Sequence, residues 1–371
     1  MRVALVHPFH WDDVRRGGER YLKDLAGYLA AEGVDVDVVT GTAGQARTEV
    51  DGRLTVRRLT HRPSALSASA GLTPLETFGF AALGTLRRGR FDVVHSLTPT
   101  AQLAARVTRA RTVYTCLGYP TAEQYRNRRR DRALLVRAVR SAQVPCAFSP
   151  AAADATAIFA GRTVTSLPLG VWSSDFPALL TPRTGPPRIL FAGFPGDARK
   201  GVGLALAAMP AILDANPDAS LVLLGDRSHH AHHHADLGDD RERVLRAVQD
   251  IGVRPMSDMP RLYREATVAI LPSRHEALGI SLVEALTSGT PVACSDDGGM
   301  TSIVSDPAVG RLHRTGDAGD LARAVREAIE LARLPGTPQR CVDHARAWDW
   351  TASVGPAHLV IYEKAMRLAR R

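Results

Sequence analysis

The chain has 371 residues with a formal net charge of +9, and hydrophobic residues make up 45% of it. Its length exceeds that of one ordinary compact core, so two domains are expected. No run of eighteen apolar residues occurs, which argues against a membrane-spanning helix. His7, Pro8 and His10 follow the first apolar run too soon for a signal peptide.

The basic residues argue against a nucleic-acid-binding surface. Only three of the 47 are lysines (Lys23, Lys200 and Lys364), and the arginines are scattered without interleaved aromatic residues. An anionic small substrate or a membrane surface stays compatible with the charge. The four cysteines are far apart with no CxxC spacing, which fits free thiols in a reducing compartment. We therefore expect a cytoplasmic protein, with peripheral contact at the inner membrane face left open.

Short apolar strands alternate with amphipathic helices in the first half of the chain. The pattern predicts a strand at Val3–Val6, a helix at Glu19–Ala31 that ends before Gly33, and a strand at Val34–Thr40. Three further strands are expected, at Phe91–His95, Thr112–Cys116 and Val144–Ser149. Strands that alternate with helices indicate a parallel sheet covered by helices on both faces.

A stretch rich in proline and glycine, residues 169–187, predicts an interdomain linker, and the same pattern restarts after it. Strands are expected at Arg188–Gly193, Ser220–Gly225, Thr267–Pro272 and Pro291–Ser295, and helices at Leu204–Ala215, Leu245–Ile251, Ile280–Ser288, Asp320–Leu334 and Val354–Arg370. The sequence therefore predicts an α/β fold with two Rossmann-like, doubly wound domains, 1–168 and 188–353, facing across a cleft. Ligands of such sheets bind beyond the carboxyl ends of the strands.

The segment from Leu271 to Val292 carries the strongest functional pattern. A buried strand ends at its start, a polar loop carries Glu276, and a helix begins near Gly279 with Glu284 one to two turns in. The free amides at the start of that helix are suited to a phosphate, because they point outward at the positive end of the helix dipole.

The two glutamates have two interpretations. As acceptors of hydroxyl hydrogen bonds, Glu276 and Glu284 would hold a sugar and a ribose, the two ends of a nucleotide sugar. Alternatively, Glu276 caps the helix and Glu284 is a solvated helix residue, since paired glutamates are common on helices. The pattern by itself favours neither interpretation.

This segment resembles the E-x7-E signature of the retaining glycosyltransferases of family 4, a group that includes bacterial mannosyltransferases and relatives of sucrose and glycogen synthases. The resemblance covers nearly the whole chain and implies a GT-B fold. It also implies that Glu276 contacts the hydroxyls of the donor sugar and that Glu284 contacts the ribose of the nucleotide. Leu278 stands where the family usually has phenylalanine.

The resemblance extends to two glycines and one lysine. Gly17 and Gly18, before an amphipathic helix, are similar to a Gly-Gly turn that lets the backbone approach the donor diphosphate. Lys200 matches a lysine that neutralises the leaving diphosphate, and the rarity of lysine in this chain fits a specific role. Phe194 stands where a second basic residue is usual. Either Arg199 or an arginine of the Arg15-Arg16 loop replaces that residue, or the leaving group loses one of its two cations.

The donor-binding candidates are therefore Gly17, Gly18, Arg199, Lys200, Glu276, Leu278, Gly279, Ile280, Ser281 and Glu284. Lys200 and Glu276 are the catalytic candidates among them. The resemblance implies that neither a metal nor another cofactor is required. The last helix, about 354–371, is expected to pack back on the first domain.

The acceptor-side candidates are His10, His95, Cys116 and Arg126. His95 matches a histidine common in the family, although a packed histidine at a strand end is the favoured interpretation. Leu117, beside Cys116, lies where many members place a histidine near the reacting carbon. Ser302 stands where a family loop often carries glutamate. These departures weaken the case for a protein general base.

Two polar runs have alternative interpretations. Residues 229–234 include five histidines, but they are expected in a surface loop, where histidine-rich stretches bind metals adventitiously. No functional metal site is expected there. The arginine-rich run 126–132 would bind a phosphorylated acceptor or an anionic lipid, or else form a solvated helix face.

The resemblance implies retaining transfer of a hexose-type sugar, by front-face displacement, from a nucleotide-sugar donor to an acceptor hydroxyl. Small-molecule and lipid-linked acceptors both stay open, including antibiotic-type compounds, envelope lipids, and small osmolytes or thiol precursors. Two alternative functions remain. One is a nucleotide-sugar epimerase or glycoside phosphorylase of the same architecture. The other is a non-catalytic nucleotide-sugar-binding subunit, which would fit the departures at Phe194, Leu117 and Ser302.

Overall fold

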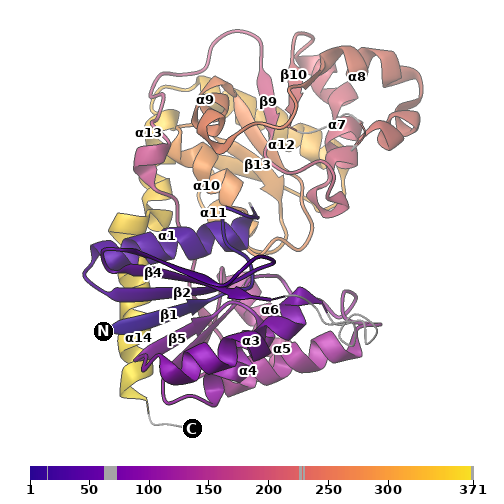
Figure 1. The fold of residues 1–371 in the computed structure, drawn as a ribbon. Coiled ribbons are helices and arrows are strands. Elements are labelled where there is room, and N and C mark those ends of the chain that lie inside the picture. The colour runs from indigo at the N-terminus through magenta and orange to yellow at the C-terminus, as the bar shows by residue number, and fades with distance from the viewer. Residues whose placement is uncertain (15, 62–72, 225–227, 229, 369–371) are drawn as a thin grey trace. The chain divides into compact units, whose positions relative to one another are not determined.

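The structure, a computed structural model, describes residues 1–14, 16–61, 73–224, 228 and 230–368 (Figure 1). It divides into two compact units. The first comprises Met1–Gly170 and the C-terminal segment from Trp350, and the second comprises Val171–Asp349. Within the described ranges, no helix is both long and apolar enough to cross a membrane.

Most of the stretch that the sequence suggested as a linker, 169–187, belongs to the second unit. Arg183, in this stretch, is buried. Its guanidinium donates hydrogen bonds to the hydroxyl of Thr290 and to four carbonyl oxygens, those of Leu179, Thr181, Ala266 and Gly289. Because a guanidinium carries five N–H donors in a fixed plane, this one arginine fastens the stretch to the domain that follows it.

The first unit is built on a sheet with the strand order β3-β4-β2-β1-β5-β6-β7-β8. Its strands are β1 (Arg2–Val6), β2 (Asp35–Thr42), β3 (Arg47–Asp51), β4 (Leu54–Thr60), β5 (Val93–Ser96), β6 (Arg111–Cys116), β7 (Val144–Ala147) and β8 (Thr165–Ser166). Among them β3 runs antiparallel to β4, and the other neighbours are parallel. The β3–β4 hairpin was not predicted, because β3 is exposed throughout and lacks an apolar face.

Helices cover both faces of this sheet (Figure 1). On one face lie α1 (Gly17–Ala31) and α14 (Gly355–Arg367), and on the other lie α3 (Pro74–Arg88) and α4 (Pro99–Arg106). Phe78 and Ala101 of the latter pair belong to one apolar core with Val94 of β5. Helices α5 (Arg129–Ser141) and α6 (Pro150–Ala160) complete the unit.

The second unit is built on a parallel sheet with the order β11-β10-β9-β12-β13-β14. Its strands are β9 (Arg188–Phe191), β10 (Ser220–Leu223), β11 (Val248–Asp250), β12 (Val268–Leu271), β13 (Val292–Ser295) and β14 (Gly310–His313). Its helices are α7 (Val202–Ala215), α8 (Arg241–Ala247), α9 (Met259–Glu265), α10 (Ile280–Thr287), α11 (Met300–Ile303), α12 (Ala318–Arg333) and α13 (Thr337–Ala345). Helices α7 and α12 share one apolar core with β9 and β12.

One predicted helix was wrong. The sequence indicated a helix at Leu245–Ile251, but α8 ends at Ala247 and the chain continues as β11. Val248–Asp250 pairs with Leu221–Leu223 of β10. Pairing with the edge of the sheet therefore overrides the local helical pattern, as happens often for short strands whose stability comes from their neighbours.

In both sheets the chain order reverses beside the first strand of the unit. β1 lies between β2 and β5, and β9 lies between β10 and β12. Loops that leave the carboxyl ends of such neighbouring strands part in opposite directions and open a crevice, the usual ligand site of a doubly wound sheet. In the second unit, the loops after β9 and β12 carry Lys200 and Glu276.

A buried polar network joins helix α14 to the rest of the first unit. The Tyr21 hydroxyl lies 2.7 Å from Nε2 of His358, and Nδ1 of His358 lies 2.7 Å from the carbonyl oxygen of Val354. His95 lies 2.9 Å from the hydroxyl of Tyr362. Burial lowers the pKa of His358 to about 4 and holds the pKa of His95 well below its usual range. Both rings are therefore neutral in the folded protein.

We expect the first unit to lose stability as pH falls from about 6.5 toward about 4. In that window the unfolded chain protonates both histidines while the folded chain keeps them neutral, so stability is complete above pH 6.5 and decreases below it. Urea unfolding at pH 7 and pH 5 measures the loss. A double variant, His95→Gln with His358→Gln, should show a shallower pH dependence than the wild-type chain. An identical slope in the two proteins would contradict the assignment.

Candidate functional site

Lys200 and Glu276 meet beyond the carboxyl ends of β9 and β12. Lys200 ends a 3-10 turn, Ala198–Lys200, and its Nζ lies 2.6 Å from Oε2 of Glu276. The two side chains are 22% and 20% exposed, so a ligand in solvent can reach the pair. Because an ammonium group has three N–H donors, the bond to Glu276 leaves Lys200 able to donate to a ligand.

Three loops are fastened to one another around this pair. The amide of Gly299 donates to the carbonyl oxygen of Glu276 at 2.8 Å, and the amide of Arg274 donates to the carbonyl oxygen of Arg199 at 2.9 Å. The carboxylate of Asp297 accepts from the amide of His275 at 2.7 Å. The loops after β9, β12 and β13 therefore form one framework. Asp297 belongs to it, although no such role could be assigned to Asp297 from the sequence.

Gly298 is the point where this framework leaves no room for a side chain. Its φ is +62°, and a Cβ at that position would lie 2.3 Å from the carbonyl oxygen of Glu276. Gly201, next to Lys200, has a φ of +78°, and a Cβ there would lie 2.3 Å from the carbonyl oxygen of Pro272. Both positions require glycine for its conformational freedom and for its lack of a side chain.

In the part of the chain that the structure describes, the start of α10 has no side-chain cap. Its N-cap residue, Gly279, has a φ of +95° and carries no side chain that could cap the helix. The carboxylate of Glu276 is bonded to Lys200 instead, so the interpretation in which Glu276 caps this helix is wrong. Leu278 and Gly279 are buried, and Ile280 and Ser281 are partly exposed. An uncapped helix start with accessible first residues keeps its amides and its dipole available to an anion.

Glu284 is buried rather than solvated, with 4% of its surface exposed. Its Oε2 accepts a hydrogen bond of 2.7 Å from the hydroxyl of Tyr263, on α9. The interpretation of Glu284 as a solvated helix residue is therefore wrong. Tyr263 could not be identified from the sequence. It lies 21 positions before Glu284 and on a different helix, so no local sequence pattern indicates the contact.

Arg199 does not join the lysine. Its guanidinium is paired with Asp197, two residues earlier, at 2.7 Å, and 64% of the side chain is exposed. Phe194 is 53% exposed. The other proposed substitute, the Arg15-Arg16 loop, lies partly outside the described residues, and Arg16 is paired with Glu19 at 3.0 Å. Lys200 is thus the cation that the described part of the second unit places beside Glu276.

In the first unit, Gly17 and Gly18 are the first two residues of α1 and do not form a separate turn. A Cβ on Gly18 would lie 3.0 Å from Cδ1 of Leu117 and 4.0 Å from Nε2 of His7. Nothing lies within 4 Å of the corresponding position on Gly17. The space at position 18 is therefore limited by the side chain of Leu117 and not by an unusual backbone angle.

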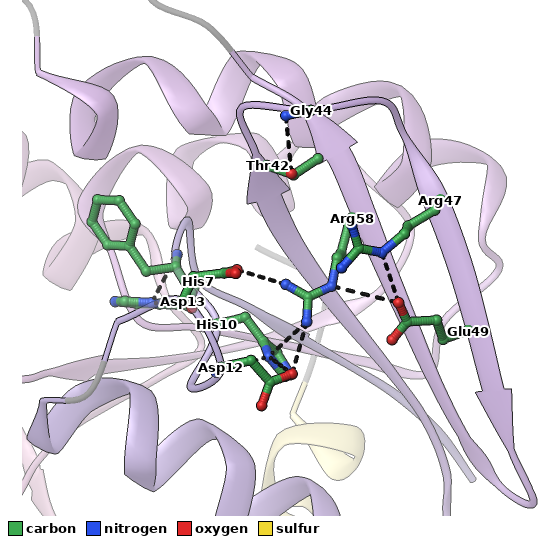
Figure 2. Close-up of polar contacts among 10 residues, drawn as sticks. His7, His10, Asp12, Asp13, Thr42, Gly44, Arg47, Glu49 and Arg58 are labelled. Atoms are coloured by element: carbon green, nitrogen blue, oxygen red, sulfur yellow. Dashed lines mark hydrogen bonds and ion pairs between the residues drawn. The ribbon is translucent and has the colours of Figure 1, made fainter.

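His10 belongs to a cluster of ion pairs around Arg58 (Figure 2). Arg58 is 2% exposed, and its guanidinium reaches Asp13 at 2.6 Å, Asp12 at 2.9 Å and Nδ1 of His10 at 3.0 Å. Burial and the positive charge of Arg58 lower the pKa of His10. The arrangement fixes the loop between β1 and α1, and it explains His10 as a neutral acceptor to Arg58.

The other acceptor-side candidates lie in different surroundings. His95 is fully buried between Tyr362 and Thr115, as a packed histidine at a strand end would be. Cys116 is buried at the end of β6, and burial raises the pKa of its thiol. Arg126 is exposed before α5. In the second unit, the hydroxyl of Ser302 donates to the carbonyl oxygen of Gly299.

The histidine-rich run is partly described, since His229 lies outside the described residues. His230 is buried, and its two ring nitrogens bond Asp250 at 2.6 Å and His234 at 3.0 Å. Within the residues that the structure describes, no group of three or more histidine, cysteine or carboxylate side chains is arranged to hold a metal ion.

Two of the cavities that open in the described part of the first unit concern the candidate site. One, of about 220 Å³, lies beyond the carboxyl ends of β1, β5 and β6 and includes His7, Leu117 and Cys116 in its walls. The other, of about 520 Å³, lies beside β3, β4 and the end of α3, and five arginines line it. Two of these, Arg2 and Arg57, are paired with the buried carboxylate of Asp37. The second cavity is therefore the outer face of an ion-pair network.

Comparison with known protein families identifies the chain. The model described as "Glycosyl transferases group 1" matches residues 180–348, and that described as "Glycosyltransferase Family 4" matches residues 15–171. The chain belongs to the group 1 glycosyltransferases. The two matches together span nearly all of both units, so the family resemblance seen in the sequence is confirmed.

This glycosyltransferase has relatives of differing length. It is 25% identical over 397 residues to a phosphatidyl-myo-inositol mannosyltransferase of Propionibacterium freudenreichii, covering 98% of the chain and 95% of that protein. It is 30% identical over 231 residues to a glycogen synthase of Mycobacterium tuberculosis, covering 60% of the chain. The match spans about half of that synthase, 52% of its length.

Solved structures confirm the predicted GT-B fold. The glycosyltransferase is similar to sucrose-phosphate synthase from Thermosynechococcus elongatus, with a TM-score of 0.79, 21% identity and 98% of each chain covered. It is also similar to HepE of Anabaena in complex with UDP-glucose, with a TM-score of 0.69, 17% identity, and 99% and 100% of the two chains covered.

The framework around Glu276 predicts a large difference between two glycine substitutions. Gly252→Ala is the control, because Gly252 has a φ of +72° and no atom within 4 Å of its Cβ position. It should cost roughly 1–2 kcal/mol, the strain of a left-handed alanine. Gly298→Ala should cost clearly more, because the added carbon also collides with the carbonyl oxygen of Glu276. Thermal unfolding of both variants measures this, and equal losses would contradict the account.

Proposed function

We propose that this glycosyltransferase moves a hexose-type sugar from a nucleotide-sugar donor to an acceptor hydroxyl. The observation that carries the proposal is the Lys200–Glu276 ion pair of 2.6 Å, beside the uncapped start of α10. The pair lies at the reversal of strand order, where a doubly wound sheet binds its ligand. Further support comes from HepE, a protein of similar fold whose structure was solved with UDP-glucose.

The charges of the second unit match the parts of such a donor. The diphosphate would lie at the amides of Gly279, Ile280 and Ser281, where the helix dipole favours an anion. Glu276 would accept hydrogen bonds from sugar hydroxyls. Glu284 would accept one from the ribose. Tyr263 donates to its Oε2, and a carboxylate can accept more than one hydrogen bond, so the tyrosine does not prevent this role.

Lys200 has a role in the reaction step. Before the donor binds, it neutralises Glu276; with the donor bound, it would also donate to the diphosphate, while Glu276 turns to the sugar. The bond from the anomeric carbon to the phosphate oxygen breaks as the acceptor oxygen bonds the same face of that carbon, so the configuration is retained. The acceptor proton passes to an oxygen of the departing diphosphate. The protein contributes charge stabilisation and positioning.

Lys200 carries an unusually large share of this stabilisation. Phe194 supplies no charge, and Arg199 is engaged with Asp197. A departing diphosphate would therefore depend on Lys200 and the helix start. The assignment of Gly17 and Gly18 to the diphosphate, and the absence of a metal requirement, remain predictions from the resemblance.

Lys200→Ala should lower turnover by ~10²-fold or more, because it removes a preorganised donor from the leaving group. Release of nucleoside diphosphate from UDP-, GDP-, ADP- and dTDP-sugars measures this. Lys364→Ala is the matched control, since it removes an exposed lysine of α14 in the other unit. Activity of Lys200→Ala within threefold of wild type would refute the role.

The anomeric proton coupling of the wild-type product, measured by NMR, should show the same anomeric configuration as the donor. Inversion of that configuration would overturn front-face displacement.

A further inference from the structure

We infer that the cavity of about 220 Å³ in the first unit takes an uncharged, ring-bearing part of the acceptor, and that His7 accepts a hydrogen bond from an acceptor hydroxyl. The inference rests on the proposed function and specifies its acceptor. Among the acceptor classes that the sequence left open, it selects alcohols with an apolar ring over phosphorylated compounds.

The cavity lies where a doubly wound unit usually binds its ligand. It opens beyond the carboxyl ends of β1, β5 and β6, at the reversal of strand order in the first sheet. Complete small-molecule sites measure roughly 300–1,000 Å³. A volume of about 220 Å³ is smaller, so the cavity holds one part of a molecule, about the size of a single ring.

The walls of the cavity are apolar and aromatic. They include Tyr114, Tyr119 and Tyr125, together with Leu97, Leu117 and Leu135. None of the described residues that line it is lysine, arginine, aspartate or glutamate. A phosphate placed here would give up water without gaining a cation, which is strongly unfavourable, whereas an apolar ring gains from the same burial.

The arginine-rich run next to Tyr125 does not change this balance. Arg126 and Arg128 are exposed, and neither lines the cavity. Arg130 is paired with Glu76 of α3 at 2.8 Å. These arginines therefore lie in water outside the cavity, where they add to the charge of the surface and do not offer a partner to a phosphate within it.

His7 supplies the polar contact. It is 3% exposed, and its Nδ1 lies 3.0 Å from the carbonyl oxygen of Phe9. The amide of Phe9 lies 3.3 Å from the same nitrogen, a longer contact than that of the carbonyl oxygen. When Nδ1 donates its proton to the carbonyl oxygen, Nε2 is left as an acceptor. His7 lines the cavity, and its Nε2 lies 4.0 Å from the position of a Cβ on Gly18. A hydroxyl at the rim of the cavity can therefore donate to Nε2 while its ring enters between the leucines and tyrosines.

A series of three related probes tests the inference by isothermal titration calorimetry. Glucose, glucose 6-phosphate and phenyl β-D-glucoside share most of their hydroxyls and differ by an added anion or an added ring. The titrations are run with whichever of UDP, GDP, ADP or dTDP raises the melting temperature. We expect phenyl β-D-glucoside to bind at least about tenfold more tightly than glucose, because one ring is buried. Glucose 6-phosphate should bind no more tightly than glucose.

Two variants locate the binding. Leu117→Lys puts a cation into the cavity and should weaken phenyl β-D-glucoside by at least about tenfold, with glucose little changed. Val107→Lys is the control, because Val107 is 55% exposed and lies outside the cavity. His7→Phe should weaken the binding of glucose and of phenyl β-D-glucoside by the same factor, since it removes a hydroxyl acceptor and keeps the apolar surface. A purely structural effect of either variant would also lower the shift produced by the nucleotide.

Tightest binding by glucose 6-phosphate would overturn the inference in favour of a charged acceptor. Equal affinity for all three probes would also overturn it, because the cavity would then contribute nothing to recognition. Failure of every nucleotide to shift the melting temperature is a different result. That outcome would refute the proposed function itself, because it would show that no nucleotide donor binds.

Discussion

The ion pair between Lys200 and Glu276 is the interaction on which the account of this glycosyltransferase depends. It exists because the sheet order places β9 beside β12, so that residues 76 positions apart meet at the carboxyl ends of adjacent strands. The backbone bonds of Gly299 and Arg274 then hold the loops at the spacing that the pair requires. An unpaired charge at this half-buried position would be unfavourable. Lys200 and Glu276 therefore neutralise each other until a ligand with charges of its own binds.

The first unit uses buried polar groups for a different purpose. Tyr21, His95, His358 and Tyr362 form hydrogen bonds in the core and join α14 to α1 and to β5. Arg58 similarly fixes the loop after β1 by reaching three of its side chains (Figure 2). In both cases buried polar side chains hydrogen-bond to partners on separate segments, which specifies one arrangement where apolar packing alone would permit several.

The sequence indicated the repeated strand–helix pattern and the loops that carry Lys200 and Glu276, because buried parallel strands are apolar runs bounded by breaks. It missed the β3–β4 hairpin, whose edge strand is exposed, and it extended a helix over β11, whose form depends on pairing with β10. Local pattern also could not show that Tyr263 holds Glu284 or that Arg199 turns to Asp197. Such contacts depend on the tertiary arrangement of helices and loops, and no spacing along the chain encodes them.

The most direct test of the donor site is the thermal stability of the protein with UDP, GDP, ADP and dTDP, each alone and with its common sugars. A nucleotide at one hundred times its dissociation constant should stabilise the fold by ~2.7 kcal/mol, a shift of a few degrees. The account predicts a strong shift with one nucleotide and a weaker one in Glu284→Ala, since that substitution removes the carboxylate assigned to the ribose. No shift with any nucleotide, or an undiminished shift in the variant, would contradict it.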